Sequence, residues 1–176
     1  MRILVAYATC HGSTRDIAKR VAGRLQSAGY SVECRAMSEI TELSDYDAVV
    51  AGSAIHDQEW LAEATSFMSR FASALRALPV WLFSVGMPAA LPKRLQGWAM
   101  MEEDQMATKM SAFVTPRGHR LFSGVVRKEH LSSSGRVRFR LMGGRYGDFR
   151  DWQEIDTWAS ALAEELHRAL GQPTAP

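Results

Sequence analysis

The first residues in the chain that could do chemistry form a short polar run near the amino terminus. Thr9-Cys-His-Gly-Ser-Thr14 contains three hydroxyl side chains around Gly12. It lies between an apolar run at 2–7, which predicts a strand, and apolar residues at helical spacing, which predict a helix over 14–28. The first amide N–H groups of a helix have no partner within it, and the helix dipole is positive there. The loop therefore predicts a phosphate site in which amides and hydroxyls act without a lysine.

Other nucleotide-binding loops do not match this spacing. No GxGxxG follows the strand, so a Rossmann dinucleotide site is disfavoured, and no GxxxxGK[ST] is present, so a P-loop is disfavoured too. A receiver domain needs carboxylates where its strands end, and Tyr7-Ala8 supplies none. One plain alternative stays open for the loop taken alone: Ser13 or Thr14 is the N-cap of an ordinary helix after a strand.

Strands and helices that could position this loop alternate along the chain. Strands are expected at 2–7, 31–35, 47–53, 80–85 and 119–126, and helices at 14–28, from about Glu59 to Pro79, across 94–110 and over 151–170. The methionines of 94–110 are expected to fill the core, and 128–146 has no clear pattern. Alternation predicts an α/β fold with a doubly wound parallel sheet and helices on both faces. With no repeat or linker, residues 1–176 are expected to be a single domain.

Composition indicates a folded protein of a reducing compartment. The 176 residues are 47% hydrophobic and 23% charged, which is close to the average for soluble domains. The apolar run at 3–8 is too short for a signal peptide or a membrane span. Cys10 and Cys34 form no CxxC pair, so neither a disulfide framework nor a metal site is expected. The expected location is the cytoplasm.

Three loops together resemble those of the flavodoxins. Residues 5–14 are similar to the FMN-phosphate loop, whose usual form is S/T-x-T-G-x-T. Ala51–His56 is similar to the first loop beside the isoalloxazine ring, and Phe83–Gly86 to the start of the second. The resemblance implies a five-stranded parallel sheet in the order 2-1-3-4-5, with FMN bound at the carboxyl ends of the first and third strands.

Among flavodoxins, the chain looks most like the menaquinone-dependent protoporphyrinogen oxidase-like group. This resemblance spans nearly the whole chain and rests on 12–17, 52–55, 82–85, the tail Arg140-Leu-Met-Gly-Gly144 and Asp151-Trp152 before the last helix. The sequence departs from that pattern at Cys10 and His11, where hydroxyl or charged residues are more usual. It departs again at Asp57-Gln58-Glu59-Trp60, where aromatic and basic residues are expected.

The resemblance implies which residues hold the cofactor. Those expected at the phosphate are Thr9, Cys10, His11, Gly12, Ser13 and Thr14. Those expected along the ring are Ser53, Ala54, Ile55, His56 and Trp60 on one edge and Ser84, Val85 and Gly86 on the other. His56 and Trp60 have aromatic faces that can stack on a flavin; the alternatives are a solvated histidine and a tryptophan packed in the core. No catalytic side chain is required, because the flavin itself carries the electrons.

Three functions follow as hypotheses from these residues. The leading one is an FMN-binding flavodoxin-like oxidoreductase, protoporphyrinogen oxidase-like, with a quinone or another redox partner as acceptor. A small FMN electron carrier is the alternative, which the net charge of +2 disfavours because flavodoxin carriers are typically acidic. A flavin-free interaction module is the second alternative. The intact Gly12, Ser13 and Thr14 argue against it, since a lost site has no reason to keep a phosphate-compatible loop.

Positive charge is concentrated in one segment, although the net charge is too small to indicate nucleic acid. From 117 to 150 the basic residues are Arg117, Arg120, Arg127, Lys128, Arg136, Arg138, Arg140, Arg145 and Arg150, against Glu129 and Asp148. One interpretation is a solvated basic face; the other is an anionic partner, which would be a peripheral membrane surface, a porphyrin carboxylate or an acidic redox protein. The bare alternation in Arg136–Leu141 is typical of an edge strand, whereas the resemblance implies a loop and a short helix.

Overall fold

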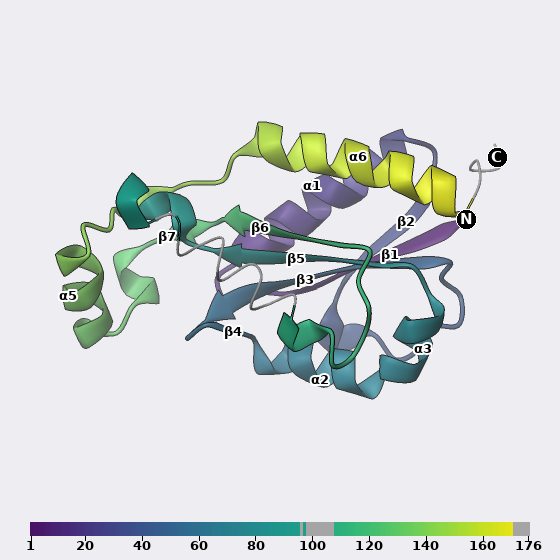
Figure 1. The fold of residues 1–176 in the computed structure, drawn as a ribbon, viewed down its shortest axis with the longest axis horizontal. Helices are drawn as coiled ribbons and strands as arrows, with labels where there is room; N and C mark the ends of the chain where they lie inside the picture. Colours follow the sequence, from purple (N-terminus) through teal and green to yellow (C-terminus); the bar gives the residue numbers. More distant parts are fainter. Residues whose placement is uncertain (96, 98–107, 171–176) are drawn as a thin grey trace.

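The computed structural model describes residues 1–95, 97 and 108–170, and its centre is a parallel sheet. The parallel strands are β1 (Arg2–Ala8), β2 (Ser31–Ala36), β3 (Ala48–His56), β5 (Val80–Gly86) and β6 (Gly118–Ser123). They lie in the order β2-β1-β3-β5-β6, with β4 (Glu59–Trp60) paired antiparallel to the end of β3 (Figure 1). Counting only the parallel strands, this is the predicted order 2-1-3-4-5, so the predicted fold class is confirmed.

Helices cover both faces of the sheet, because the central strands are apolar on both sides. The helices are α1 (Ser13–Ser27) and α6 (Trp152–Leu170) on one face and α2 (Ala62–Arg70) and α3 (Ala72–Ala77) on the other (Figure 1). One core cluster joins Ile17 and Ile155 to Val5 and Phe83. The opposite cluster joins Phe67 of α2 to Leu82. Neighbouring residues of one strand thus point into different cores.

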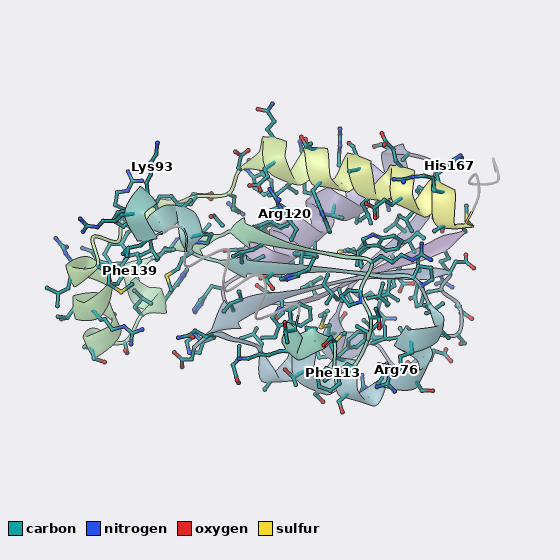
Figure 2. The ribbon with its side chains drawn as sticks, viewed as in Figure 1. Arg76, Lys93, Phe113, Arg120, Phe139 and His167 are labelled. Atoms are coloured by element: carbon teal, nitrogen blue, oxygen red, sulfur yellow. The ribbon has the colours of Figure 1, made fainter. Side chains whose placement is uncertain are left out.

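Short elements after β6 build a lobe at one end of the molecule. They are β7 (Val125–Val126), the 3-10 helix η3 (Lys128–His130), α5 (Ser133–Leu141) and β8 (Gly147–Asp148). The 3-10 helix η2 (Pro88–Ala90), which follows β5, packs on them through a small cluster of Ala90, Val126 and Phe139. Figure 1 shows α5 standing apart from the sheet, and Figure 2 labels Phe139 within this lobe. We call residues 124–150 the α5 lobe.

Two sequence-based expectations about element boundaries were wrong. The helix expected from about Glu59 begins only at Ala62, because Glu59 and Trp60 form β4, and it breaks at Phe71 between α2 and α3. The strand expected over 119–126 is divided at Gly124 into β6 and β7. A Cβ atom at Gly124 would lie 2.9 Å from Val85 Cγ1, so there is no room for a side chain at the point where the strand is interrupted.

The other elements after β3 include one confirmed prediction and one that cannot be compared with the described residues. Arg136–Leu141 lies within α5, as the family resemblance implied, and Ser132 Oγ caps this helix by accepting from Gly135 N at 3.2 Å. The helix expected across 94–110 falls largely outside the described residues. The 3-10 helix η1 (Met37–Glu39) was not predicted. In the part of the chain that the structure describes, no helix is long and apolar enough to cross a membrane.

Candidate functional site

The expected phosphate loop forms a turn that ends in the first turn of α1. Gly12 adopts φ 93°, a left-handed conformation that favours glycine, and its N–H donates to Thr9 Oγ1 at 2.9 Å. Gly12 is the N-cap of α1, and no side chain caps that helix. The alternative interpretation of the loop, in which Ser13 or Thr14 is the N-cap of an ordinary helix, is therefore wrong. The amide groups that open α1 therefore point into the loop without an intrahelical partner.

The hydrogen bonding of the Thr14 hydroxyl indicates whether this loop fits a phosphate. Its side chain is fully buried, and its Oγ1 has no hydrogen-bond partner among the described residues. A buried hydroxyl without a partner is destabilising, whereas a phosphate oxygen held by the neighbouring amides would satisfy it. Ser13 is differently placed, since its Oγ accepts from Val125 N at 3.2 Å. The residues present thus fit a bound phosphate group.

The first expected ring loop is a tight hairpin between β3 and β4. Asp57 and Gln58 have φ 50° and 63°, a left-handed pair that non-glycine residues adopt sparingly. The side chain of His56 projects into solvent and is 70% exposed. Its Nε2 lies 3.5 Å from Oδ2 of Asp57. Trp60 is 4% exposed and belongs to the core cluster under α2. Its side chain thus packs in the core, which was the alternative to stacking on the flavin.

Two buried serines fix the ends of the ring loops. Ser84 Oγ accepts from Trp60 Nε1 at 2.7 Å. Ser53 Oγ accepts from Leu61 N at 3.2 Å and donates to Ala54 O at 2.9 Å. Since both hydroxyls are used within the protein, only the backbone at these positions can face a ligand. Gly86 O accepts from Gly124 N at 2.9 Å, which connects the second loop to the α5 lobe.

All three loops meet at one edge of the sheet. Ala8 lies level with Ser53, and Ser53 with Ser84, so β1, β3 and β5 end side by side. Strand order reverses between β1 and β3, and in doubly wound sheets a ligand crevice forms outside the carboxyl ends of the strands at this point. The predicted site residues of the three loops are therefore brought to a common edge, apart from the side chain of Trp60, which lies beneath it.

Contacts between the α5 lobe and the phosphate loop were not predicted from the sequence. His130 of η3 stacks on His11 with ring centroids 3.8 Å apart, and Arg150 forms ion pairs with Asp16 and Asp148. Burial lowers the pKa of His11 below its ordinary value, and the nearby His130 and His56 lower it further. The side-chain hydrogen bond from Arg150 lowers the pKa of Asp148. His11 and His130, like Asp16 and Arg150, are more than a hundred residues apart in the sequence, so no local signal could have paired them.

A doubly wound sheet with an amide-rich loop at its switch point defines the class of flavin- and nucleotide-binding α/β proteins. Within that class, the chain belongs to the flavodoxin domain family, whose model matches residues 4–148.

Curated and solved relatives agree with this family. The chain is 24% identical to protoporphyrinogen IX dehydrogenase [quinone] of Escherichia coli (strain K12), over 93% of this chain and 95% of that protein. It resembles oxidised flavodoxin 2 from Bacillus cereus with a TM-score of 0.58, at 20% identity over 94% of this chain and 99% of that one. It also resembles rubredoxin oxygen:oxidoreductase from Desulfovibrio gigas, with a TM-score of 0.59 and 15% identity. That alignment covers 96% of this chain and 37% of the larger protein.

Family membership makes FMN the cofactor and the chain an FMN-binding, flavodoxin-like oxidoreductase. The unsatisfied Thr14 hydroxyl and the glycine turn that precedes it suit the phosphate end of that cofactor. When bound, FMN supplies one- or two-electron transfer, and the protein supplies binding and orientation.

Proposed function

We propose that this chain oxidises a protoporphyrinogen-type substrate through FMN and passes the electrons to a quinone. The observation that supports redox function is the convergence of the three loops at the β1–β3 switch point, with Thr14 Oγ1 buried and unsatisfied. The similarity to a protoporphyrinogen IX dehydrogenase [quinone], which extends over 93% of the chain, supports the substrate and the acceptor.

In this proposal the residues have binding roles. The amides of residues 10, 11, 13 and 14 and the hydroxyls of Thr9 and Thr14 hold the phosphate, while the Gly12 N–H donates to Thr9 Oγ1 and closes the turn. The backbone of Ala54–His56 lines one edge of the ring, and that of Ser84–Gly86 lines the other. His56 is free to turn toward the ring face, because its side chain is exposed. Trp60 supports the ring loop from below, since its side chain is buried.

Visible absorbance of the purified protein, before and after incubation with FMN and desalting, tests the cofactor. Retained flavin bands are the expected result. Turnover of protoporphyrinogen with reduction of a menaquinone analogue then tests the reaction. Fast exchange with a ferredoxin reductase, without quinone activity, would favour the small electron carrier. A colourless protein that retains no FMN would favour the interaction module.

The second part of the proposal is that the α5 lobe docks on an anionic lipid surface. Val137 is 61% and Leu141 82% exposed, and they lie one helical turn apart on the side of α5 opposite the buried Phe139. Arg138 and Arg140 flank them. Apolar side chains flanked by arginines suit the headgroup region of a membrane, where a lipid-soluble quinone is found.

Charge distribution supports the same orientation. The lobe carries five more basic than acidic residues, whereas the whole chain has a net charge of +2, so the rest of the chain is net acidic. An anionic surface would attract the lobe and repel the body. His167 and Arg76 lie at the opposite end of the molecule from Phe139 (Figure 2).

Co-sedimentation with vesicles tests this docking. We expect binding to phosphatidylglycerol vesicles and not to phosphatidylcholine vesicles, with salt weakening it. Val137→Ser/Leu141→Ser and Arg138→Gln/Arg140→Gln should each reduce binding severalfold. Lys19→Gln/Arg168→Gln, which removes two cations from α1 and α6, is the charge-matched control. Equal binding by all variants would contradict the docking surface, as would dimerisation through Val137 and Leu141 without vesicles.

A further inference from the structure

A chain of hydrogen bonds runs from the buried Trp60 and Ser84 to the half-buried His119 and connects the two expected ring loops. Trp60 Nε1 donates to Ser84 Oγ at 2.7 Å, and Ser84 Oγ lies 2.8 Å from His119 Nε2. Trp60 is 4% exposed, and Ser84 is fully buried. The three side chains come from β4, β5 and β6, so three separate segments meet at one hydroxyl group.

The chemistry of the groups determines the direction of these bonds. An indole N–H can only donate, so Ser84 Oγ accepts from Trp60. The hydroxyl hydrogen of Ser84 is then available to His119 when Nε2 is unprotonated. When Nε2 carries a proton, it donates to the second lone pair of the oxygen. In both cases His119 restrains the rotamer of Ser84, and that rotamer presents the oxygen to Trp60.

Trp60 stands at the base of a hairpin that must be held in a sparsely populated conformation. The turn residues Asp57 and Gln58 both have left-handed φ values. Ile55 pairs with Trp60 across the hairpin, and the next backbone N–H, that of Leu61, is held by Ser53. The side chain of Trp60 and the backbone of Leu61 are thus two anchors for one strained turn. Loss of either anchor allows the turn to relax.

We propose that His119 is a positioning residue for the flavin ring. Acting through Ser84, it holds Trp60 in the core and thereby fixes the hairpin that carries Ile55 and His56 along one edge of the ring. The inference rests on the flavin site proposed above. His119 lies level with Leu82, two residues below Ser84 along β5, and so acts from beneath the carboxyl edge of the sheet.

Affinities for FMN and riboflavin, measured on the full-length protein, test this role. Riboflavin has the same ring and no phosphate, so a displaced ring loop weakens both ligands equally, whereas a damaged phosphate loop weakens FMN alone. We expect His119→Leu and Ser84→Ala to raise both dissociation constants by about tenfold, which corresponds to the loss of one buried hydrogen bond. His119→Gln retains a polar group at the same reach and should remain near wild type.

A double-mutant cycle separates positioning from general destabilisation. Trp60→Phe keeps the buried ring and removes the N–H, so Trp60→Phe/Ser84→Ala should bind flavin no more weakly than Ser84→Ala alone. The midpoint potential of bound FMN is the second readout. A variant that weakens the oxidised and reduced forms unequally by tenfold shifts a two-electron potential by about 30 mV. A purely structural role would lower the melting temperature and leave the potential unchanged.

Each outcome decides the inference. Wild-type affinities for both flavins in His119→Leu and Ser84→Ala would overturn the positioning role and leave the flavin site standing. A wild-type protein that binds neither flavin would overturn the site and the positioning role together. If Ser84→Ala does not fold, Trp60→Phe takes its place, because it breaks the same bond while keeping an aromatic side chain in the core. Wild-type riboflavin affinity in that variant would overturn the role.

Discussion

The imidazole rings of His11 and His130 lie parallel, with centroids 3.8 Å apart and an angle of 4° between their planes. This stack joins the expected phosphate loop to η3 in the α5 lobe. Two protonated rings at this distance would repel each other, so the stack is most stable when at least one ring is neutral.

Stability should therefore fall in acid partly through this stack. Burial, together with His130 and His56, lowers the pKa of His11. The folded state then binds the proton less well than the unfolded state, so stability is lost as pH falls below the unfolded value of about 6.5. We expect His130→Gln to show a smaller drop in melting temperature between about pH 7 and pH 5. His167→Gln, on the outer helix α6, is the control; identical pH profiles for wild type and His130→Gln would contradict the expectation.

Gly52 should tolerate no side chain. A Cβ atom there would lie 2.0 Å from Phe83 Cζ, inside a core where both residues are buried. Gly52→Ala is expected to lower the free energy of unfolding by about 3 kcal/mol through overpacking. Gly23→Ala is the matched control, since nothing lies within 4 Å of its Cβ position in α1. That variant should gain about 0.5–1 kcal/mol from helix propensity. Urea titrations measure both, and equal stabilities would refute the steric argument.

Thr14 should matter to the phosphate and not to the fold. Removal of a buried hydroxyl without a partner leaves the flavin-free protein as stable or more stable, by about 1 kcal/mol at most. Thr14→Val should weaken FMN binding by about tenfold to a hundredfold, since a charge-assisted hydrogen bond is lost. Riboflavin binding should not change. Thr157→Val, at an exposed position of α6, is the control, and equal losses of affinity for both flavins would speak against a phosphate role.

The two cysteines should differ sharply in reactivity. Burial raises the pKa of Cys34 to about 11, whereas Cys10 is exposed in the phosphate loop. At about pH 8, only about one in a thousand Cys34 groups is a thiolate. We expect a thiol reagent to label Cys10 in the folded protein and Cys34 only after unfolding, with FMN slowing the labelling of Cys10. Mass spectrometry of wild type and Cys10→Ser measures this. Rapid labelling of folded Cys10→Ser would contradict it.

The order of the strands could be predicted because it follows from patterns between neighbouring residues in the sequence. Apolar runs such as 2–7 and 80–85 are followed by helical periodicity, and right-handed crossovers then leave few topologies. Gly12 and the hydroxyls around it likewise identify the phosphate loop from adjacent residues alone.

The hairpin at Asp57 and Gln58 could not be predicted, since neither residue is a glycine or an asparagine that would favour left-handed backbone. The position of Trp60 depends on Ser84, which is 24 residues away. The close approach of Gly124 to Val85 joins two separate strands. The stack on His11 is formed by His130, which lies in a lobe whose own sequence shows no clear periodicity. Each of these features is decided by tertiary contacts, which single-sequence patterns do not contain.

The small cluster of Ala90, Val126 and Phe139 should make the α5 lobe open more readily than the rest of the protein. Among the described residues, this cluster is far smaller than the two that cover the sheet, so the α5 lobe has little apolar burial of its own. Its amide protons should therefore exchange with solvent through a partial opening that requires less free energy than global unfolding. Such an opening would separate His130 from His11 and Arg145 N from Ala90 O together, which releases the phosphate loop and the segment after β5 in one cooperative event.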